Sequence, residues 1–172
     1  TRGPEGGAPA QWPSGSRARR AAGQATLVML GHPQCPCTRA TIAELALLMT
    51  HCQGRVQATV LFLKPAGVDE QWVHTDLWDS AARIPGVHVM EDSGGVEAER
   101  FGALTSGQTL LYDANGRLLF SGGITDGRGH EGENPGRDAV EALLRGEPAG
   151  RAKNFVFGCG LRDARREAKW SR

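Results

Sequence analysis

Residues 25–49 read ATLVMLGHPQCPCTRATIAELALLM, an apolar run followed by a helical pattern. The run, residues 25–30, does not alternate strictly with polar residues and is bounded by a glycine and a proline, which is typical of a strand buried on both faces. Apolar residues then recur at spacings of three or four from Ile42 to Met49. This pattern predicts a helix of about four turns that begins near Thr38 and ends at Gln53.

Two thiols stand at the junction between this strand and this helix, in the tripeptide Cys35-Pro36-Cys37. The unsatisfied N–H groups and the positive dipole end of a helix stabilise a thiolate and lower the pKa of a cysteine there. Pro36 suits the first helical position, where its missing N–H costs no hydrogen bond. A thiolate is both a nucleophile and a metal ligand, so the tripeptide predicts redox or metal chemistry and leaves the choice open.

The remaining pattern is that of an α/β domain. Residues 25–30 and 56–63 fit a β-α-β crossover, and Asn115-Gly116 marks the turn of a later hairpin. The expected strands are residues 25–30, 56–63, 86–90, 109–112 and 117–121, and the expected helices are 38–53, 69–83, 96–101 and 137–145. This order of elements is that of the thioredoxin fold.

Both ends of the chain are expected to lie outside this domain. Residues 1–22 are rich in proline, glycine and arginine, with almost nothing apolar except Trp12, and are predicted to be a flexible arm. The domain is expected to span residues 23–146 and the tail 147–172, which docks through the segment Phe155 to Cys159. Because the first residue is not methionine, we expect a signal peptide or a membrane anchor upstream.

Charge and hydropathy argue against two classes of protein. The 172 residues carry a formal net charge of +1, which gives no field for attracting nucleic acid. No stretch approaches the roughly 20 apolar residues that a membrane span requires. The sequence therefore predicts neither a nucleic-acid-binding protein nor a membrane-spanning one.

Residues 25–145 resemble the membrane-tethered, periplasmic thioredoxin-like proteins of bacteria, related to the TlpA-like oxidoreductases, and most closely the group labelled RedB. The matching stretches are GHPQCPCTRATIAELALL from residue 31, TSGQTLLYDANGRLLFSGGIT from residue 105 and GRGHEGENPGR from residue 127. The resemblance implies a thioredoxin-like fold with a central mixed sheet of about four to five strands and helices on both faces. It also implies a thiol-disulfide oxidoreductase in an oxidising compartment, usually anchored by an N-terminal helix.

The cysteine motif departs from the Cys-x-x-Cys of ordinary thioredoxins. Aligning the following helix places Cys35 at the first cysteine of that motif and Thr38 at the second, so that Cys37 is an additional thiol. Cys35 is then the expected nucleophile and Cys37 a close resolving partner. A disulfide between them would close a very small, strained and easily reduced ring, which favours an oxidase or an isomerase over a general reductant.

A second departure concerns the proline that thioredoxins keep in cis before the first hairpin strand. Here the site falls within Thr105-Ser106-Gly107-Gln108, which contains no proline. A cis bond without proline costs about 3 kcal/mol, so we expect a trans loop adapted by glycine, with the hydroxyl of Thr105 or Ser106 facing Cys35. In thioredoxins this proline prevents metal binding by the thiols, so its absence gives weight to a metal site.

The fold implies that the loop 122–136, with His130 and Glu131, returns near Cys35. His130 is predicted either to pair with a thiolate or to serve as a third ligand beside Cys35 and Cys37, a set that suits copper or zinc. A solvated loop is the alternative. His32, three residues before Cys35, is a possible neighbour that tunes its pKa.

The other two cysteines, Cys52 and Cys159, differ in whether they can approach the Cys35-Pro36-Cys37 motif. Cys52 follows the far end of the predicted helix, roughly 20 Å from the motif, and cannot resolve a bond at Cys35. Cys159 lies in a tail long enough to return to the motif or to stop beside Cys52. A structural disulfide between Cys52 and Cys159 and a resolving or ligating role for Cys159 are both open, and the Phe-Gly-Cys tail, which resembles the end of RedB-like chains, favours the second.

The function expected from these observations is thiol-disulfide exchange with protein thiols or disulfides, in the periplasm or another extracytoplasmic compartment. The predicted catalytic residues are Cys35, Cys37, Cys159, Thr38 and Thr105, and no cofactor is expected. The alternative is a copper-binding protein or metallochaperone that holds Cu(I) through Cys35 and Cys37, with His130 or Cys159 completing the site.

Overall fold

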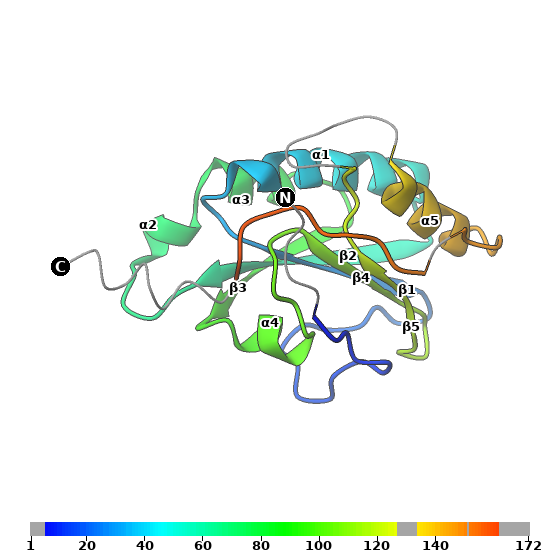
Figure 1. Cartoon of the computed structure of the whole chain (residues 1–172), viewed down its shortest axis with the longest axis horizontal. Helices are drawn as coiled ribbons and strands as arrows, with labels where there is room; N and C mark the ends of the chain where they lie inside the picture. The colour runs from blue at the N-terminus through cyan, green and yellow to red at the C-terminus, as the bar shows by residue number, and fades with distance from the viewer. Residues whose placement is uncertain (1–5, 127–133, 151, 162–172) are drawn as a thin grey trace.

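A mixed sheet forms the centre of the structure, a computed structural model that describes residues 6–126, 134–150 and 152–161 (Figure 1). In this part of the chain the sheet has five strands in the order β3-β2-β1-β4-β5. β1 is parallel to β2 and β2 to β3, whereas β4 is antiparallel to both β1 and β5. The strands are β1 (Ala25–Gly31), β2 (Val56–Lys64), β3 (Val87–Ser93), β4 (Gln108–Tyr112) and β5 (Leu118–Gly122).

Helices cover both faces of this sheet, as expected (Figure 1). One face carries α1 (Pro36–His51), α3 (Asp76–Ala82) and α5 (Pro135–Leu144), and the other carries α4 (Val96–Arg100). The four-residue α2 (Glu70–Val73) precedes α3. None of the helices described has the length and apolar character needed to cross a bilayer.

Two hydrophobic cores lie on either side of β1, because successive residues of a strand point to opposite faces. Leu27 and Met29 pack with α1, α3 and α5, whereas Val28 and Leu30 pack with α4 and the N-terminal segment. All four side chains are buried. The absence of alternation in this run is therefore explained by its position at the centre of the sheet.

The helix predicted over residues 69–83 is interrupted, and this prediction was wrong in detail. Asp69 begins α2 by accepting a hydrogen bond from the backbone N–H of Trp72 at 3.0 Å. Thr75 then adopts an extended backbone and donates its hydroxyl to the carbonyl of Pro33 at 2.8 Å. This bond to the loop before α1 breaks the helix in two and starts α3.

The N-terminal segment, expected to be a flexible arm, packs against the α4 face over the residues described. Trp12 makes edge-to-face contacts with Phe101 and Tyr112, each with ring centroids 5.2 Å apart. Its backbone N–H donates to the carbonyl of Gly116 at 2.8 Å, and Ala18 is buried. The aromatic contacts of Trp12 and hydrogen bonds to the hairpin and to α4 thus anchor this polar segment.

An ion pair joins the two long helices that flank the sheet. Nη1 of Arg137 on α5 lies 2.5 Å from Oε2 of Glu44 on α1, and their side chains are 15% and 1% exposed. A charge of this degree of burial needs a compensating partner, because removing one member leaves the other in a medium of low dielectric constant.

We predict that Arg137→Ala lowers the free energy of unfolding by about 3 kcal/mol, measured by urea denaturation. The matched control is Arg39→Ala, which breaks a pair of the same 2.5 Å length with Asp76, but with side chains 62% and 68% exposed. The control is expected to change stability by less than about 1 kcal/mol. Equal losses in the two variants would contradict this account of the pair.

Candidate active site

Cys35 lies at the N-terminal end of α1, in the position that the sequence predicts for a nucleophile. It is the residue before the first helical turn, with an extended backbone, and Pro36 follows as the first helical residue. The N–H of Thr38 donates to the carbonyl of Cys35 at 3.0 Å, and the N–H of Cys35 donates to the carbonyl of His32 at 3.2 Å. The thiol is buried, with 2% of the residue exposed.

The structure brings Cys159 to Cys35. Their Sγ atoms are 2.7 Å apart, although the two residues are separated by 124 positions in the sequence. Cys52 follows the other end of the 16-residue α1, about 24 Å away at the rise of an α-helix. Of the two placements that the sequence left open for Cys159, the structure has the one beside Cys35.

The tail reaches this position through two stretches of main-chain pairing. The first lies along β5, where the N–H of Ser121 donates to the carbonyl of Ala152 at 3.0 Å and the N–H of Gly123 donates to that of Phe155 at 3.2 Å. Val156, which follows, is buried. The tail therefore adds to the open edge of β5 before it crosses toward α1.

The second stretch pairs the tail with the loop that precedes β4. The N–H of Ser106 donates to the carbonyl of Cys159 at 2.7 Å, and the N–H of Leu161 donates to the carbonyl of Leu104 at 2.8 Å. Thr105 and Gly160 face one another as an antiparallel bridge between these bonds. Two directional bonds thus fix the main chain at the cysteine and two residues after it.

Glycines allow the tail to lie flat against the domain. A Cβ atom on Gly158 would stand 2.1 Å from the carbonyl oxygen of Ser106, and one on Gly123 would stand 2.5 Å from that of Phe155. Both distances are too short for any side chain. Glycine is therefore required at each contact for the two backbones to approach.

The loop opposite Cys35 has the trans conformation predicted from its missing proline, since the described residues contain no cis peptide bond. Gly107 has φ +95°, and its N–H donates to the carbonyl of Leu30 in β1 at 2.8 Å. The Ser106 hydroxyl accepts from the N–H of His32 at 2.8 Å and lies 3.0 Å from the hydroxyl of Thr38. Ser106 therefore ties this loop to the start of α1.

The other residues predicted for the site lie around this junction. Thr38 is buried and donates its hydroxyl to the carbonyl of His32 at 3.0 Å, so it acts on the loop before α1. Cys37, in the first turn of α1, is also buried. Thr105 is buried under the tail, where its Cγ2 would contact a side chain at Gly158. The imidazole of His32 packs edge-on against Trp72 at 5.4 Å.

Opposing effects act on the acidity of the Cys35 thiol. Burial raises its pKa, but the thiol and backbone of Cys159 and, to a smaller degree, those of Cys37 stabilise the thiolate by hydrogen bonding. The net pKa of Cys35 is lowered from the ordinary value of a cysteine. In contrast, burial and the nearby carboxylate of Glu141 raise the pKa of Cys52. Cys35 is therefore the more reactive thiol of these two.

A metal site with three or more ligands is not found among the described residues. His130 and Glu131, predicted to return near Cys35, lie outside those residues. The prediction that His130 completes a copper site with Cys35 and Cys37 thus remains a prediction. Two neighbouring thiols, Cys35 and Cys159, are the soft donors that Cu(I) prefers.

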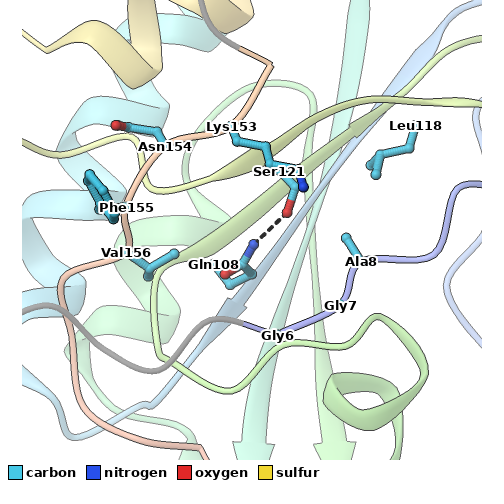
Figure 2. A pocket seen from close by; sticks show the side chains of 10 residues that line it. All are labelled: Gly6, Gly7, Ala8, Gln108, Leu118, Ser121, Lys153, Asn154, Phe155 and Val156. Atoms are coloured by element: carbon cyan, nitrogen blue, oxygen red, sulfur yellow. Dashed lines mark hydrogen bonds between the residues drawn. The ribbon is translucent and has the colours of Figure 1, made fainter.

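A pocket of about 350 Å³ lies beside the tail and not at the thiols (Figure 2). It is bounded by residues 6–8 of the N-terminal segment, by β4 and β5, and by residues 153–156 of the tail. Figure 2 shows Gln108 and Ser121 pointing toward one another, where Nε2 of Gln108 donates to the Ser121 hydroxyl at 2.8 Å. This bond joins the facing side chains of β4 and β5 at the wall of the pocket.

Comparison with solved structures identifies the fold. A hypothetical protein from Sinorhizobium meliloti is similar with TM-score 0.68 and 21% identity, over 94% of this chain and 93% of that one. An uncharacterised conserved protein from Geobacillus kaustophilus has TM-score 0.66 and 19% identity, over 94% and 91%. The exposed lipoprotein thioredoxin of Streptococcus pneumoniae has TM-score 0.51 and 15% identity, over 72% and 85%.

The chain therefore has a thioredoxin-like fold, as its order of elements predicts. No protein-family model and no curated protein matches the sequence. The first two structures match almost the whole chain, whereas the lipoprotein thioredoxin leaves more than a quarter of it unmatched.

Sequence reasoning did not find every residue of the site. Leu104 and Leu161 contribute through main-chain atoms, which leave no mark on the choice of side chain. The sequence offered Thr105 or Ser106 as the hydroxyl that faces Cys35, whereas the bonds given by the structure join the Ser106 hydroxyl to His32 and Thr38. Gly158 carried a partial signal, because glycine permits the close approach of another backbone.

We predict that Cys159→Ala raises the pKa of Cys35, because it removes a hydrogen bond that stabilises the thiolate and leaves the burial that opposes it. The thiolate then forms at higher pH, which a titration of the Cβ chemical shift in protein labelled with [13Cβ]cysteine would detect. Cys52→Ala is the control and leaves the titration of Cys35 unchanged. An unshifted titration in Cys159→Ala would contradict the assigned cause.

Proposed function

We propose that this protein is a thiol-disulfide oxidoreductase in which Cys35 is the nucleophile and Cys159 the resolving thiol. The observation that carries the proposal is the 2.7 Å separation of their Sγ atoms at the N-terminal end of α1. A lowered pKa of Cys35 supports the same assignment, because the thiolate is the reactive form. The thioredoxin-like fold agrees with this chemistry.

The first step is attack by the Cys35 thiolate on one sulfur of a disulfide in a partner protein. The partner's S–S bond breaks, a mixed disulfide forms at Cys35, and the first partner sulfur leaves as a thiolate that takes up a proton. Polar groups around Cys35 favour its ionised form before attack, while Thr38 and Ser106 position the loop that precedes it.

The second step is attack by Cys159 on Sγ of Cys35. The mixed disulfide breaks, a bond between Cys35 and Cys159 forms, and the second partner sulfur leaves as a thiolate. The partner's disulfide is thereby reduced by two electrons, and the two thiols of this chain are oxidised. Run in reverse, the same steps oxidise a pair of partner thiols, and the compartment's redox poise decides the direction.

Cys37 is the competing resolving thiol, since it lies in the same motif. Resolution by Cys37 would require a ring within the first turn of α1, where helical backbone geometry holds the main chain, whereas Cys159 approaches from a separate segment. We therefore assign the resolving role to Cys159. The proposed setting is the periplasm or another exported compartment, where a disulfide persists between cycles.

The test compares three variants in reduction of a protein disulfide such as that of insulin. Cys35→Ser is expected to lower the rate about 100-fold or more, because the nucleophile is lost. Cys159→Ser is expected to accumulate a mixed disulfide between Cys35 and the substrate, visible by mass spectrometry. Cys37→Ser is the matched control and keeps the rate within about threefold.

Two results would overturn parts of this proposal. Trapping of the mixed disulfide in Cys37→Ser, with turnover intact in Cys159→Ser, assigns resolution to Cys37. Tight stoichiometric binding of Cu(I) by the reduced protein, with no thiol exchange by any form, replaces the oxidoreductase with a copper-binding protein. Titration with Cu(I) in parallel with the exchange assay distinguishes these cases.

A further inference from the structure

The pocket beside β5 has no part in the proposed thiol exchange. Its volume is about 350 Å³, near the lower end of the range for sites that bind small molecules. Residues 6–8 of the N-terminal segment and residues 153–156 of the tail form two of its walls, and β4 and β5 form its floor (Figure 2). A cavity bounded by both terminal segments is therefore available to a small ligand.

Main-chain hydrogen bonds fix these walls. The N–H of Leu118 donates to the carbonyl of Ala10 at 2.9 Å, which attaches the N-terminal segment to β5. On the side of the tail, the N–H of Ser121 donates to the carbonyl of Ala152 at 3.0 Å, and the N–H of Asn154 donates to that of Ser121 at 3.2 Å. The pocket is thus built before any ligand enters, so that a ligand does not have to order its walls.

A hydroxyl group in the floor of the pocket is available as a hydrogen-bond donor. Gln108 is 5% exposed, and its Nε2 donates to Oγ of Ser121 at 2.8 Å. Oγ thereby serves as an acceptor, and its own proton has no acceptor among the residues that the structure describes. The Ser121 hydroxyl can therefore donate to a ligand, in a position that Gln108 fixes.

A cation stands beside this hydroxyl. Lys153 pairs with Ser121 in a parallel bridge, which places the two side chains on the same face, and Figure 2 shows the lysine extending toward the serine. Within the described part of the chain Lys153 makes no ion pair, and none of the residues that line the pocket is acidic. The ammonium and the hydroxyl are both donors, which the two oxygens of a carboxylate can accept.

The rest of the lining is largely apolar. Ala8 and Leu118 border the pocket on one side, and Phe155 and Val156 border it on the side of the tail. A ligand with its charge at the exposed Lys153 and an aliphatic chain against these residues would bury apolar surface while its carboxylate stays near water. A sugar would instead place hydroxyl groups against this apolar wall without partners.

We propose that this pocket binds a small monocarboxylate with a short aliphatic chain. Lys153 and the Ser121 hydroxyl bind the carboxylate, and Ala8, Leu118 and Val156 contact the chain. Neither Cys35 nor Cys159 lines the pocket, so this site goes beyond the proposed function and requires no thiol chemistry.

The probe is hexanoate, titrated into the full chain labelled with nitrogen-15 and followed by NMR through the amide signals of Ser121 and Asn154. Both residues line the pocket, so both signals are expected to shift and to saturate. Butyrate, which is shorter by two methylene groups, is expected to bind about tenfold more weakly because it buries less apolar surface. Hexan-1-amine has the opposite charge on a chain of the same length and is expected to produce no saturable shift.

Two variants test the two halves of the site. Lys153→Met is expected to weaken hexanoate binding about fivefold or more, because the carboxylate loses its charged partner. Its matched control is Arg55→Met, which removes an exposed cation outside the pocket and leaves the affinity unchanged. Ala8→Leu fills part of the cavity and is expected to weaken binding about tenfold or more, whereas Ala66→Leu, at an exposed position outside the pocket, does not.

Equal affinity for hexanoate and hexan-1-amine, or an unchanged affinity in Lys153→Met, would overturn this inference. Absence of saturation by hexanoate in the parent protein would overturn it as well. Circular dichroism checks that each variant folds, and Ala8→Leu provides the independent test if Lys153→Met does not. Because the titration measures no thiol chemistry, its failure leaves the proposed oxidoreductase standing, and Cys35→Ser is expected to bind hexanoate as the parent protein does.

Discussion

The arrangement of this protein depends on how one buried loop satisfies its backbone hydrogen bonds. Residues 104–107 lie between α4 and β4 with little access to water, and unpaired N–H or carbonyl groups there would be costly. The N–H of Gly107 bonds to β1, and the Ser106 hydroxyl accepts a bond from the N–H of His32. The N–H of Ser106 and the carbonyl of Leu104 bond to the tail. The tail therefore supplies hydrogen-bond partners that this buried loop needs. Because the carbonyl of its cysteine accepts one of those two bonds, satisfying the loop also positions the second thiol.

The missing proline explains why this solution is available. A proline at Ser106 would have no N–H to donate to Cys159 and no hydroxyl to accept from His32. Serine provides both, and the following Gly107 adopts the positive φ that lets the chain turn toward β1. Substitution of the proline and recruitment of the tail are thus two aspects of one local arrangement.

The sequence predicted most of the fold and about half of the site, for reasons that particular residues make clear. Uninterrupted apolar runs predicted the strands of the sheet, and an Asn-Gly pair predicted the hairpin. Burial on both faces and a tight turn each strongly restrict which residues can occupy a position. The break between α2 and α3 was missed, since it depends on a bond from Thr75 to a loop 42 residues earlier. Packing of the N-terminal segment was missed because one tryptophan and hydrogen bonds that leave no apolar pattern in the sequence supply it. Cys35 was found from its helix, whereas the position of Cys159 depended on main-chain pairing between segments more than 50 residues apart.

The separation of the two thiols in the sequence ties redox state to chain topology. A bond between residues 35 and 159, 124 positions apart, would enclose almost the entire domain in one covalent loop. In the chain-entropy description, a loop of this size restricts the unfolded ensemble by about 5 kcal/mol. The oxidised form would then resist unfolding and proteolysis better than the reduced form, and the reduced form would be the one whose tail end is free to open. Resistance to proteolysis would thus report the oxidation state of the protein.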